Sequence, residues 1–254
     1  MILNIKKICL ERNIILIEDN CESLGTELPE GKAGNFSLGA SFSFFVAHHM
    51  STIEGGMVCT DDEEFAEMLR IVRANGWDRN LTAKQQYKWR QKYNIQSEFD
   101  AKYTFYDLGF NFRLTEIQAV LGISQLKRLE TFLSKRAKLV ESYKMLLEFK
   151  SQIAPAQVCA ISGSSNHIFP IRIKFSSETK SRNQIMLNLK QHGIGSQVHY
   201  IPIPVQPYYS ELGYSIADIP EAFSYYEEAL TIPLFPRLKK RQQKRIIDIL
   251  EKSI

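Results

Sequence analysis

The first part of the chain alternates short apolar runs with polar loops. Three runs, at residues 13–18, 40–45 and 56–59, are rich in β-branched, aromatic or other apolar side chains and predict buried strands. Residues 1–13 have apolar positions at helical spacing and end in charged residues, which predicts an amphipathic helix rather than a signal peptide. Strands that alternate with helices predict an α/β fold, a mixed sheet flanked by helices.

Two helix starts are visible beyond the third strand. Residues 60–63 read Thr-Asp-Asp-Glu and predict a capping box, with the helix ending near Asn75 and Gly76. A second box at residues 115–118 opens a long helix that continues, or restarts after a kink, through Leu147. The apolar residues expected to face inward on it are Ile117, Val120, Leu121, Leu126, Leu129 and Phe132.

The segment between these helices, residues 77–107, is polar and lacks a clear period, which predicts a long functional or mobile loop. Beyond residue 153 the pattern changes to a β-type run at 168–175, a helix at 182–192, an extended stretch at 195–205 and two C-terminal helices. We therefore expect a large domain over residues 1–135 that carries the 77–107 insertion loop. A linking helix and a small α+β domain should occupy residues 136–254.

Composition and charge narrow the classes of protein. The chain has 254 residues, 44% hydrophobic and 24% charged, as in ordinary globular proteins. No apolar run approaches the roughly 20 residues of a membrane span, and the net charge of +4 with no aromatic-interleaved basic patch does not indicate nucleic-acid binding. The four cysteines form no C-x-x-C pair, so we expect no metal site, no disulfide framework and a cytoplasmic location.

Three clusters of residues could carry chemistry. Asp19 follows a predicted strand, where ligands bind in open α/β sheets, although taken alone it is better explained as the cap of a turn. Ser43 and His48 lie in a loop that leaves the second strand, and its small hydroxyls and amides suit a phosphate. Asn111 and Arg113 precede the second capped helix, where they could bind an anion or serve only as local caps.

The three clusters in this order, over nearly the whole chain, resemble the DegT/DnrJ/StrS family of nucleotide-sugar aminotransferases. The segments that carry the resemblance are IEDNCESLG (17–25), FSFFVAHHMSTIEGGMV (42–58), GFNFRLTEIQA (109–119), HYIPIPVQPYY (199–209) and LTIPLFPRL (230–238). The resemblance implies a large domain of the pyridoxal-phosphate aminotransferase type, incomplete here, because full-length members have a long segment before the Asp19 strand. We therefore expect a truncated chain, half of a split enzyme or a remnant.

The resemblance also implies a role for each site residue. Asp19 would pair with the protonated pyridine nitrogen of pyridoxal or pyridoxamine phosphate, which keeps the ring electron-withdrawing. Ser43 would hold the cofactor phosphate, and Glu22 stands where relatives often have Gln or His beside the ring. Asn111 would reach the phosphate of a neighbouring subunit, which implies a dimer with shared sites. Arg113, together with His199 and Tyr200 of the sugar-facing segment, would contact the substrate.

His48 stands where the aminotransferases of this family carry lysine. Imidazole cannot form the covalent linkage that lysine makes to the cofactor, but it can act as a general acid or base near neutral pH. The same replacement marks the 3-dehydratases of nucleotide-linked 4-keto-6-deoxy sugars, which the EDNCES stretch also resembles. One branch of these enzymes carries an iron–sulfur cluster on cysteines after the equivalent of Gly76-Trp77, and residues 76–94 contain no cysteine, so we expect no cluster.

The predicted reaction is thus a 3-dehydration of a nucleotide-linked keto sugar in surface-polysaccharide synthesis, with His48 as base. Two alternatives stay open. HYIPIP resembles the sugar-facing loop of aminotransferases, which would use glutamate and 2-oxoglutarate as partners. The late start of the chain also allows a catalytically inactive fragment, or a subunit that needs a second copy or a complementing N-terminal half.

Overall fold

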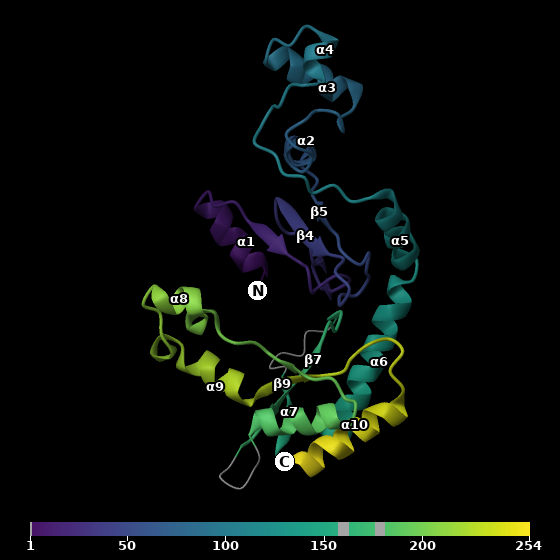
Figure 1. The fold of residues 1–254 in the computed structure, drawn as a ribbon, viewed down its shortest axis with the longest axis vertical. Helices are drawn as coiled ribbons and strands as arrows, with labels where there is room; N and C mark the ends of the chain where they lie inside the picture. The colour runs from purple at the N-terminus through teal and green to yellow at the C-terminus, as the bar shows by residue number, and fades with distance from the viewer. Residues whose placement is uncertain (1, 157–162, 176–180) are drawn as a thin grey trace. The chain divides into compact units, whose positions relative to one another are not determined.

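The computed structural model describes residues 2–156, 163–175 and 181–254. The chain divides into two compact units, Met1–Leu129 and Glu130–Ile254, which are treated separately below (Figure 1). The division predicted at residue 135 falls within helix α6 (Leu129–Leu147), so the observed boundary lies at the start of that helix and not within it.

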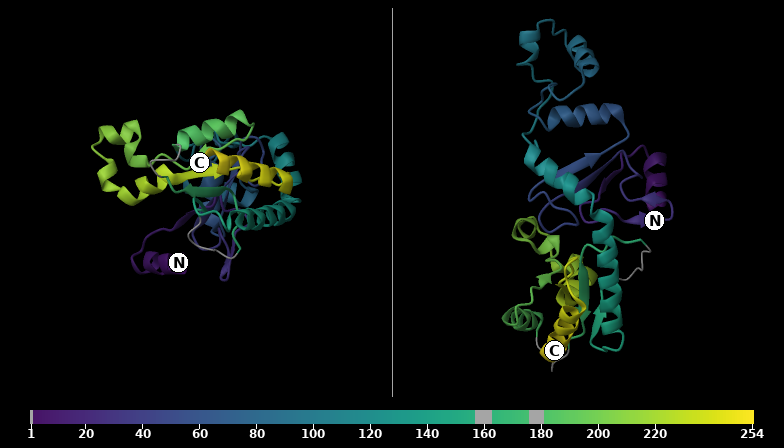
Figure 2. Two further views of the ribbon diagram at one scale, coloured as in Figure 1. Left: turned by 90° about the horizontal axis from the view of Figure 1, so that it is seen from below. Right: turned by 90° about the vertical axis from the view of Figure 1, so that its right-hand side faces the viewer.

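The N-terminal unit is built on a three-stranded mixed sheet of order β1-β4-β5, namely β1 (Ile17–Asp19), β4 (Gly39–Ser43) and β5 (Gly56–Cys59). Strands β1 and β4 are parallel, and β4 and β5 are antiparallel. Helix α1 (Ile2–Glu11) precedes the sheet, and a two-stranded hairpin, β2 (Glu27–Leu28) with β3 (Gly31–Lys32), follows β1. The α/β class and a strand at 56–59 are confirmed (Figure 2), but the predicted burial is wrong for β5, whose four residues are all exposed, and for β1, whose Ile17 and Asp19 are exposed.

The other two predicted strands have shorter bounds than expected. The first begins at Ile17 and not at residue 13, because Asn13 and Ile14 close the end of α1. Asn13 has a left-handed φ of 52°, and the Ile14 amide donates to the Cys9 carbonyl over 2.8 Å. The second ends at Ser43, where a loop over residues 44–55 begins. The Phe44 amide donates to the Gly55 carbonyl, and the Phe44 carbonyl accepts from the Thr52 amide, so these bonds close the loop.

Helix α2 (Glu63–Val72) lies where it was predicted, but its cap does not. Asp62 is the N-cap, with its side chain accepting a hydrogen bond of 2.7 Å from the Phe65 amide. Thr60 instead donates its hydroxyl to the Leu38 carbonyl, so the predicted capping box at Thr60 is wrong. The predicted stop signal is correct in kind, because Asn75 and Gly76 both have positive φ, at 61° and 82°, just after the helix.

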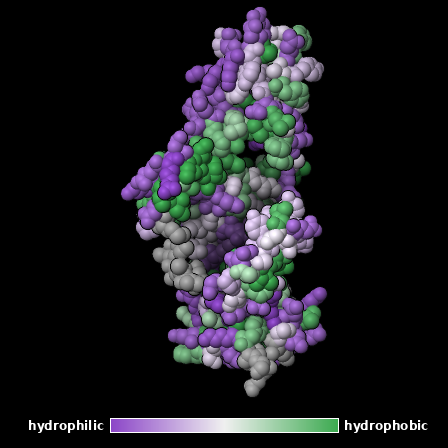
Figure 3. Space-filling view, turned by 90° about the vertical axis from the view of Figure 1, so that its left-hand side faces the viewer, coloured by the Kyte–Doolittle hydropathy of each residue, from purple (hydrophilic) through white to green (hydrophobic). Residues whose placement is uncertain are grey.

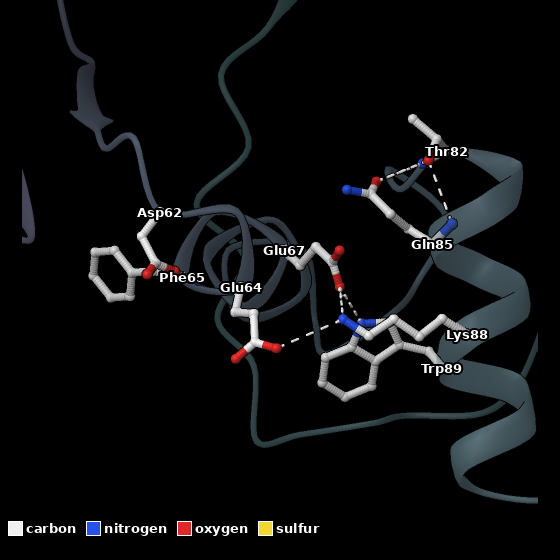
Figure 4. A network of polar contacts seen from close by, with 8 residues as sticks. All are labelled: Asp62, Glu64, Phe65, Glu67, Thr82, Gln85, Lys88 and Trp89. Carbon is white, nitrogen blue, oxygen red and sulfur yellow. Dashed lines mark hydrogen bonds and ion pairs between the residues drawn. The ribbon is translucent and has the colours of Figure 1, made fainter.

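The prediction of an irregular loop over residues 77–107 is wrong, because this segment contains two helices, α3 (Ala83–Lys92) and α4 (Glu98–Ala101). A capping box between Thr82 and Gln85 starts α3. Trp89 of α3 donates its indole N–H to buried Glu67 of α2 over 3.0 Å, and Lys88 lies 3.7 Å from the same carboxylate (Figure 4). Polar contacts to α2, together with the packing of Trp89 against the apolar cluster of Ile71, Leu81 and Tyr106, therefore hold α3 in place.

A buried ion pair closes this insertion. Asp78 is 1% exposed and accepts from Arg90 Nε over 2.9 Å and from the Tyr106 hydroxyl over 3.3 Å. Removal of the carboxylate leaves a guanidinium and a phenol without their acceptor. We expect Asp78→Ala to lower the free energy of unfolding by about 3 kcal/mol, measured by chemical denaturation.

The matched control is Glu64→Ala, which removes an 89% exposed carboxylate 3.9 Å from Lys88. Exposed pairs of this kind contribute at most about 1 kcal/mol, so this variant should unfold close to the parent chain. Equal stability of the Asp78→Ala and Glu64→Ala variants would show that the buried pair does not hold the insertion together.

The long helix of the sequence prediction is two helices, α5 (Glu116–Leu126) and α6 (Leu129–Leu147), so the restart is confirmed, as is the capping box of Thr115 and Gln118. The prediction that its apolar residues face inward is wrong for Ile117, Val120 and Leu126, which are 84%, 66% and 57% exposed. Helical spacing predicts that these residues share a face, but not that the chain covers that face. Apolar side chains reach the surface elsewhere too, as the space-filling view shows (Figure 3).

The C-terminal unit has a four-stranded antiparallel sheet of order β6-β7-β9-β8. Its strands are β6 (Ile153–Pro155), β7 (Phe169–Ile173), β8 (Gln197–Val198) and β9 (Ala229–Ile232). Its helices after α6 are α7 (Arg182–Gln191), η1 (Ile203–Val205), α8 (Pro207–Glu211), η2 (Ile216–Asp218), α9 (Pro220–Glu228) and α10 (Lys240–Ser253). The predicted strand near 168–175 and helix near 182–192 are confirmed, whereas β9 was not predicted.

Apolar side chains of this sheet and of α6, α7 and α10 form one core. Tyr143, Leu189 and Leu250 are fully buried in it. The Tyr143 hydroxyl donates to the Pro233 carbonyl over 2.9 Å, and the Gln243 amide donates to the Leu139 carbonyl over 2.8 Å, so these two buried donors are paired, whereas Gln243 Oε1 has no hydrogen-bond partner among the described residues. These contacts fix the helices around the sheet, whose strands β8 and β9 precede and follow the His199 segment.

Candidate active site

The carboxyl ends of β1 and β4 meet at one edge of the sheet, because these strands are parallel. Asp19 is the last residue of β1 and pairs in register with Ser41, and Ser43 ends β4. Residues two apart on a strand share a face, so Asp19, Ser41 and Ser43 lie on the same side of the sheet. The sequence prediction that polar groups gather at the strand ends is consistent with this arrangement.

Asp19 is held as an anion. Its Oδ1 accepts hydrogen bonds of 3.1 Å from the Cys21 amide and 3.1 Å from the Ser41 hydroxyl. The hydrogen bonds from Cys21 are the main cause that lowers the pKa of the Asp19 carboxyl below its usual value of 3.8. Hydrogen bonding from Ser41 and the positive charge of protonated His48 act in the same direction and outweigh the effect of burial. His48 therefore lies close enough to Asp19 to interact with it electrostatically.

The loop that carries His48 is fixed at both ends. The His48 amide donates to the Phe45 carbonyl over 3.0 Å, and the two rings meet edge to face with centroids 6.1 Å apart. At the far end, the Thr52 hydroxyl donates to the Glu54 carbonyl over 2.8 Å, and Gln118 of α5 donates to the same carbonyl over 2.7 Å. The start of α5 thus fixes the turn that follows the histidine.

This turn contains backbone strain. Ile53 has a φ of 73°, a left-handed conformation that β-branched residues rarely adopt. Gly55 follows with a φ of 150°, and a Cβ at that position would lie 2.4 Å from the Thr52 hydroxyl. Such strain persists where the surrounding structure enforces it and is common at functional sites. Ser43, on the strand before this loop, accepts from the Phe45 amide over 3.2 Å, which leaves its hydroxyl hydrogen to donate elsewhere.

Glu18 anchors the loop that connects β1 to β4. Its two carboxylate oxygens accept from the amides of Gly34, over 2.7 Å, and Phe36, over 2.8 Å. Burial raises the pKa of Glu18, but these amide hydrogen bonds outweigh burial and lower the pKa below its usual value of 4.5. The carboxylate is therefore ionised in the folded chain throughout the neutral range.

We expect Glu18→Gln to lower the free energy of unfolding by about 1 kcal/mol at neutral pH, because the amide replaces one charged acceptor. The depressed pKa gives the sign of the pH dependence. The stabilisation is fully present above pH 4.5 and is lost as the pH falls through the folded-state pKa. Denaturation of both chains across this range should show the difference shrinking in acid. A difference that stays constant would exclude a contribution from the ionised carboxylate.

Asn111 and Arg113 lie on a separate segment that pairs with the end of α2. Asn111 bridges to Ala74, and the Asn75 amide donates to the Phe110 carbonyl over 2.8 Å. Gly109 is required here, because a Cβ on it would lie 2.0 Å from the Gly76 nitrogen. Arg113 Nε donates to Asn111 Oδ1 over 3.2 Å, so the two predicted residues contact each other on an exposed surface.

His199 and Tyr200 lie in the C-terminal unit, just after β8. Their rings are 4.9 Å apart, and His199 also meets Tyr225 at 6.2 Å. Arg172 lies over the Tyr225 ring at 5.8 Å and forms an ion pair of 2.6 Å with Glu228. Tyr200 is 59% exposed at the end of this row.

The structure brings together Asp19, Ser43 and His48, with Glu22 nearby on the exposed turn after β1. The negative charges of Asp19 and Glu22 add to burial in raising the pKa of the Cys21 thiol, so Glu22 is within electrostatic range of Cys21. The sequence analysis missed Ser41. The alternation of Ser41 and Ser43 on one strand could have indicated that both face the same side.

The fold is a mixed α/β sheet with charged and hydroxyl groups at its strand ends, followed by an antiparallel α+β unit, and it defines a protein of the pyridoxal-phosphate aminotransferase fold. A model of the DegT/DnrJ/EryC1/StrS aminotransferase family matches residues 2–251, and the chain belongs to this family.

Three relatives illustrate what the chain is similar to. The GDP-4-keto-6-deoxy-D-mannose 3-dehydratase of Escherichia coli O55:H7 is 39% identical over 191 residues, which are 75% of this chain and 47% of that protein. The structure of the E. coli dehydratase with bound hydrated PLP has a TM-score of 0.82 and 30% identity, covering 97% of this chain and 62% of that one. Helicobacter pylori PseC, an aminotransferase of pseudoaminic acid biosynthesis, has a TM-score of 0.84 and 27% identity, covering 99% and 62%.

The chain therefore spans between about half and three fifths of the length of these relatives. Across residues 2–156, 163–175 and 181–254, no group of three or more His, Cys, Asp and Glu side chains is placed to hold a metal ion. In that same part of the chain, the helices are too short or too polar for any of them to span a bilayer.

Proposed function

We propose that this chain forms the cofactor-binding and sugar-binding part of a pyridoxamine-phosphate-dependent enzyme. Its substrate would be a nucleotide-linked 4-keto-6-deoxy sugar, and its reaction the loss of the 3-hydroxyl as water. The observation that carries the proposal is the imidazole of His48 within electrostatic range of ionised Asp19, at the carboxyl edge of β1 and β4. The 39% identity to a 3-dehydratase supports the same reaction.

The residues at this edge fit the cofactor. An aspartate kept ionised by its neighbours can accept a hydrogen bond from the N–H of a cationic pyridine ring and so keep the ring protonated. The Ser43 hydroxyl, with its oxygen already accepting an amide hydrogen, can donate to a phosphate. Asn111 would donate its amide to that phosphate from a neighbouring subunit, and Glu22 would lie beside the ring. When bound, the cofactor supplies a primary amine and an electron-withdrawing ring.

His48 would move the protons. Its imidazole would accept a proton as a base and, as an acid, would give a proton to the sugar hydroxyl, which would leave as water. An imidazole holds no permanent covalent bond to the cofactor, which favours elimination over completed transfer of the amine. Arg113, His199 and Tyr200 would bind the nucleotide-linked sugar, and Arg113 suits its phosphates by charge.

The test is a product analysis. The chain, the amine cofactor and GDP-4-keto-6-deoxymannose are incubated together, and the sugar nucleotides are resolved by mass spectrometry. The expected result is replacement of the 3-hydroxyl by hydrogen, a net loss of one oxygen atom from the sugar, with the cofactor amine converted to the aldehyde and its nitrogen released as ammonia. An amino sugar as the main product, formed with glutamate as amine donor, would show that the activity is transamination and not dehydration. No binding of cofactor, with or without an added partner chain, would favour a non-catalytic role.

A nucleotide-sugar aminotransferase is the second candidate. The HYIPIP segment and the TM-score of 0.84 with PseC favour it. In both cases a second copy of the chain would contribute Asn111 to the site. Cofactor affinity that rises with chain concentration would support this contribution.

A further inference from the structure

Ser41 lies directly beside the proposed ring-binding carboxylate, although it sits inside a strand and not in a loop. The parallel register pairs Asp19 of β1 with Ser41 of β4, which puts both side chains on one face of the sheet. The Ser41 hydroxyl donates to Asp19 Oδ1 over 3.1 Å. No role was assigned to this hydroxyl in the proposed reaction.

A second donor meets the same oxygen. The Cys21 amide donates to Asp19 Oδ1 over 3.1 Å, and the Cys21 sulfur lies 3.8 Å from the Ser41 hydroxyl oxygen. One donor comes from the turn after β1 and the other from the neighbouring strand. Both bonds are accepted by Oδ1, and the Cys21 thiol adds a further hydrogen bond to the same carboxylate.

Two donors on one oxygen restrict how a carboxylate can rotate. The terminal torsion of aspartate is broad and roughly two-fold, so a single exposed carboxylate has little intrinsic preference for one orientation. Bonds from two separate elements select one orientation and keep Oδ1 engaged. The direction of Oδ2 then follows from the position of Oδ1.

We propose that Ser41 is a positioning residue, whose hydroxyl acts with the Cys21 amide to fix Oδ1 of Asp19 so that Oδ2 is the oxygen offered to the cofactor ring. This inference rests on the proposed function, because it gives Asp19 its partner. Ser41 acts through Asp19 and does not itself touch the cofactor. It differs from Ser43, whose proposed partner is the phosphate.

The test uses the full chain with Ser41→Ala, which removes the hydroxyl, and Ser41→Thr, which keeps a hydroxyl on a residue that strands favour. The first measurement is the pKa of Asp19 without cofactor, obtained by a pH titration of its carboxyl ¹³C NMR signal. The Asp19→Asn variant, which lacks this signal, assigns it. We expect Ser41→Ala to raise this pKa and Ser41→Thr to restore it. Ser37→Ala is the control, because that hydroxyl bonds to the Gly39 carbonyl and not to Asp19.

The second measurement is the affinity for pyridoxamine phosphate by calorimetry. We expect about a tenfold loss in Ser41→Ala, the effect of roughly one charge-assisted hydrogen bond, and recovery in Ser41→Thr. An unchanged Asp19 pKa in Ser41→Ala would overturn the anchoring. A raised pKa with unchanged affinity would overturn the link to the cofactor. If the parent chain binds no cofactor while the pKa still responds, the proposed function fails and the anchoring of Asp19 stands alone.

Discussion

Replacing His48 with asparagine should lower the rate of water elimination by about 10³-fold, the contribution of a well-placed general acid–base group. Asparagine keeps similar size and polarity but cannot exchange a proton near neutral pH. Cofactor affinity should change little, because Asp19 and Ser43 are untouched. The measurement is turnover of the keto sugar at saturating pyridoxamine phosphate, followed by mass spectrometry.

His192→Asn is the matched control, since His192 is exposed in the C-terminal unit and bonds only locally to the Asn188 carbonyl. A companion variant, His48→Lys, should gain a covalent link to the aldehyde form of the cofactor, which borohydride reduction makes permanent and visible as added mass. Unchanged turnover in His48→Asn, or no adduct in His48→Lys with cofactor bound, would remove His48 from the site.

The second large effect is expected at Asp19. Asp19→Asn should weaken cofactor binding by roughly 10²-fold or more, because a charge-assisted contact with the ring nitrogen is replaced by a neutral one. Turnover should fall with it, since the ring loses its electron-withdrawing form. The pKa of Asp19 is lowered, so the carboxylate is ionised across the neutral range and the loss of affinity should not depend on pH there.

Glu27→Gln serves as the control, since it changes an exposed carboxylate on β2 in the same way. Calorimetric titration with pyridoxamine phosphate gives both affinities. Equal affinities for the two variants would show that the carboxylate of Asp19 does not meet the ring.

The sequence predicted the sheet and the position of the candidate site because both follow from local rules. Strand ends collect polar ligand-binding groups, and Asp19 and Ser43 end β1 and β4. This rule does not identify Ser41, because Ser41 lies inside β4. Only the pairing of β4 with β1 brings it next to Asp19, which is 22 residues away along the chain. Register depends on which strands meet, and periodicity in one strand does not encode it.

The helices of residues 77–107 were missed for a different reason. Helix α3 has no apolar stripe, and it is held by the Thr82 cap and by Trp89, which bonds to Glu67 and packs against the cluster of Ile71, Leu81 and Tyr106. A Thr-x-x-Gln signal identical in kind to the one at Thr115 was present at Thr82, so the start of α3 was predictable. The partner of Trp89 was not, because a buried glutamate on another helix leaves no local pattern.

The backbone contact between Gly76 and Gly109 has a consequence for engineering. The chain leaves and rejoins the N-terminal unit at nearly one point, with Tyr106 also bonded to the Gly76 carbonyl over 2.8 Å. The residues between these two glycines thus form an insertion whose two ends lie next to each other. This insertion could be replaced by a short turn or by a foreign domain, and Asn111 would stay paired as it is now. Ile71, which these residues help to bury, would then need a polar replacement, whereas the carboxylate of Glu67 could be solvated as it is.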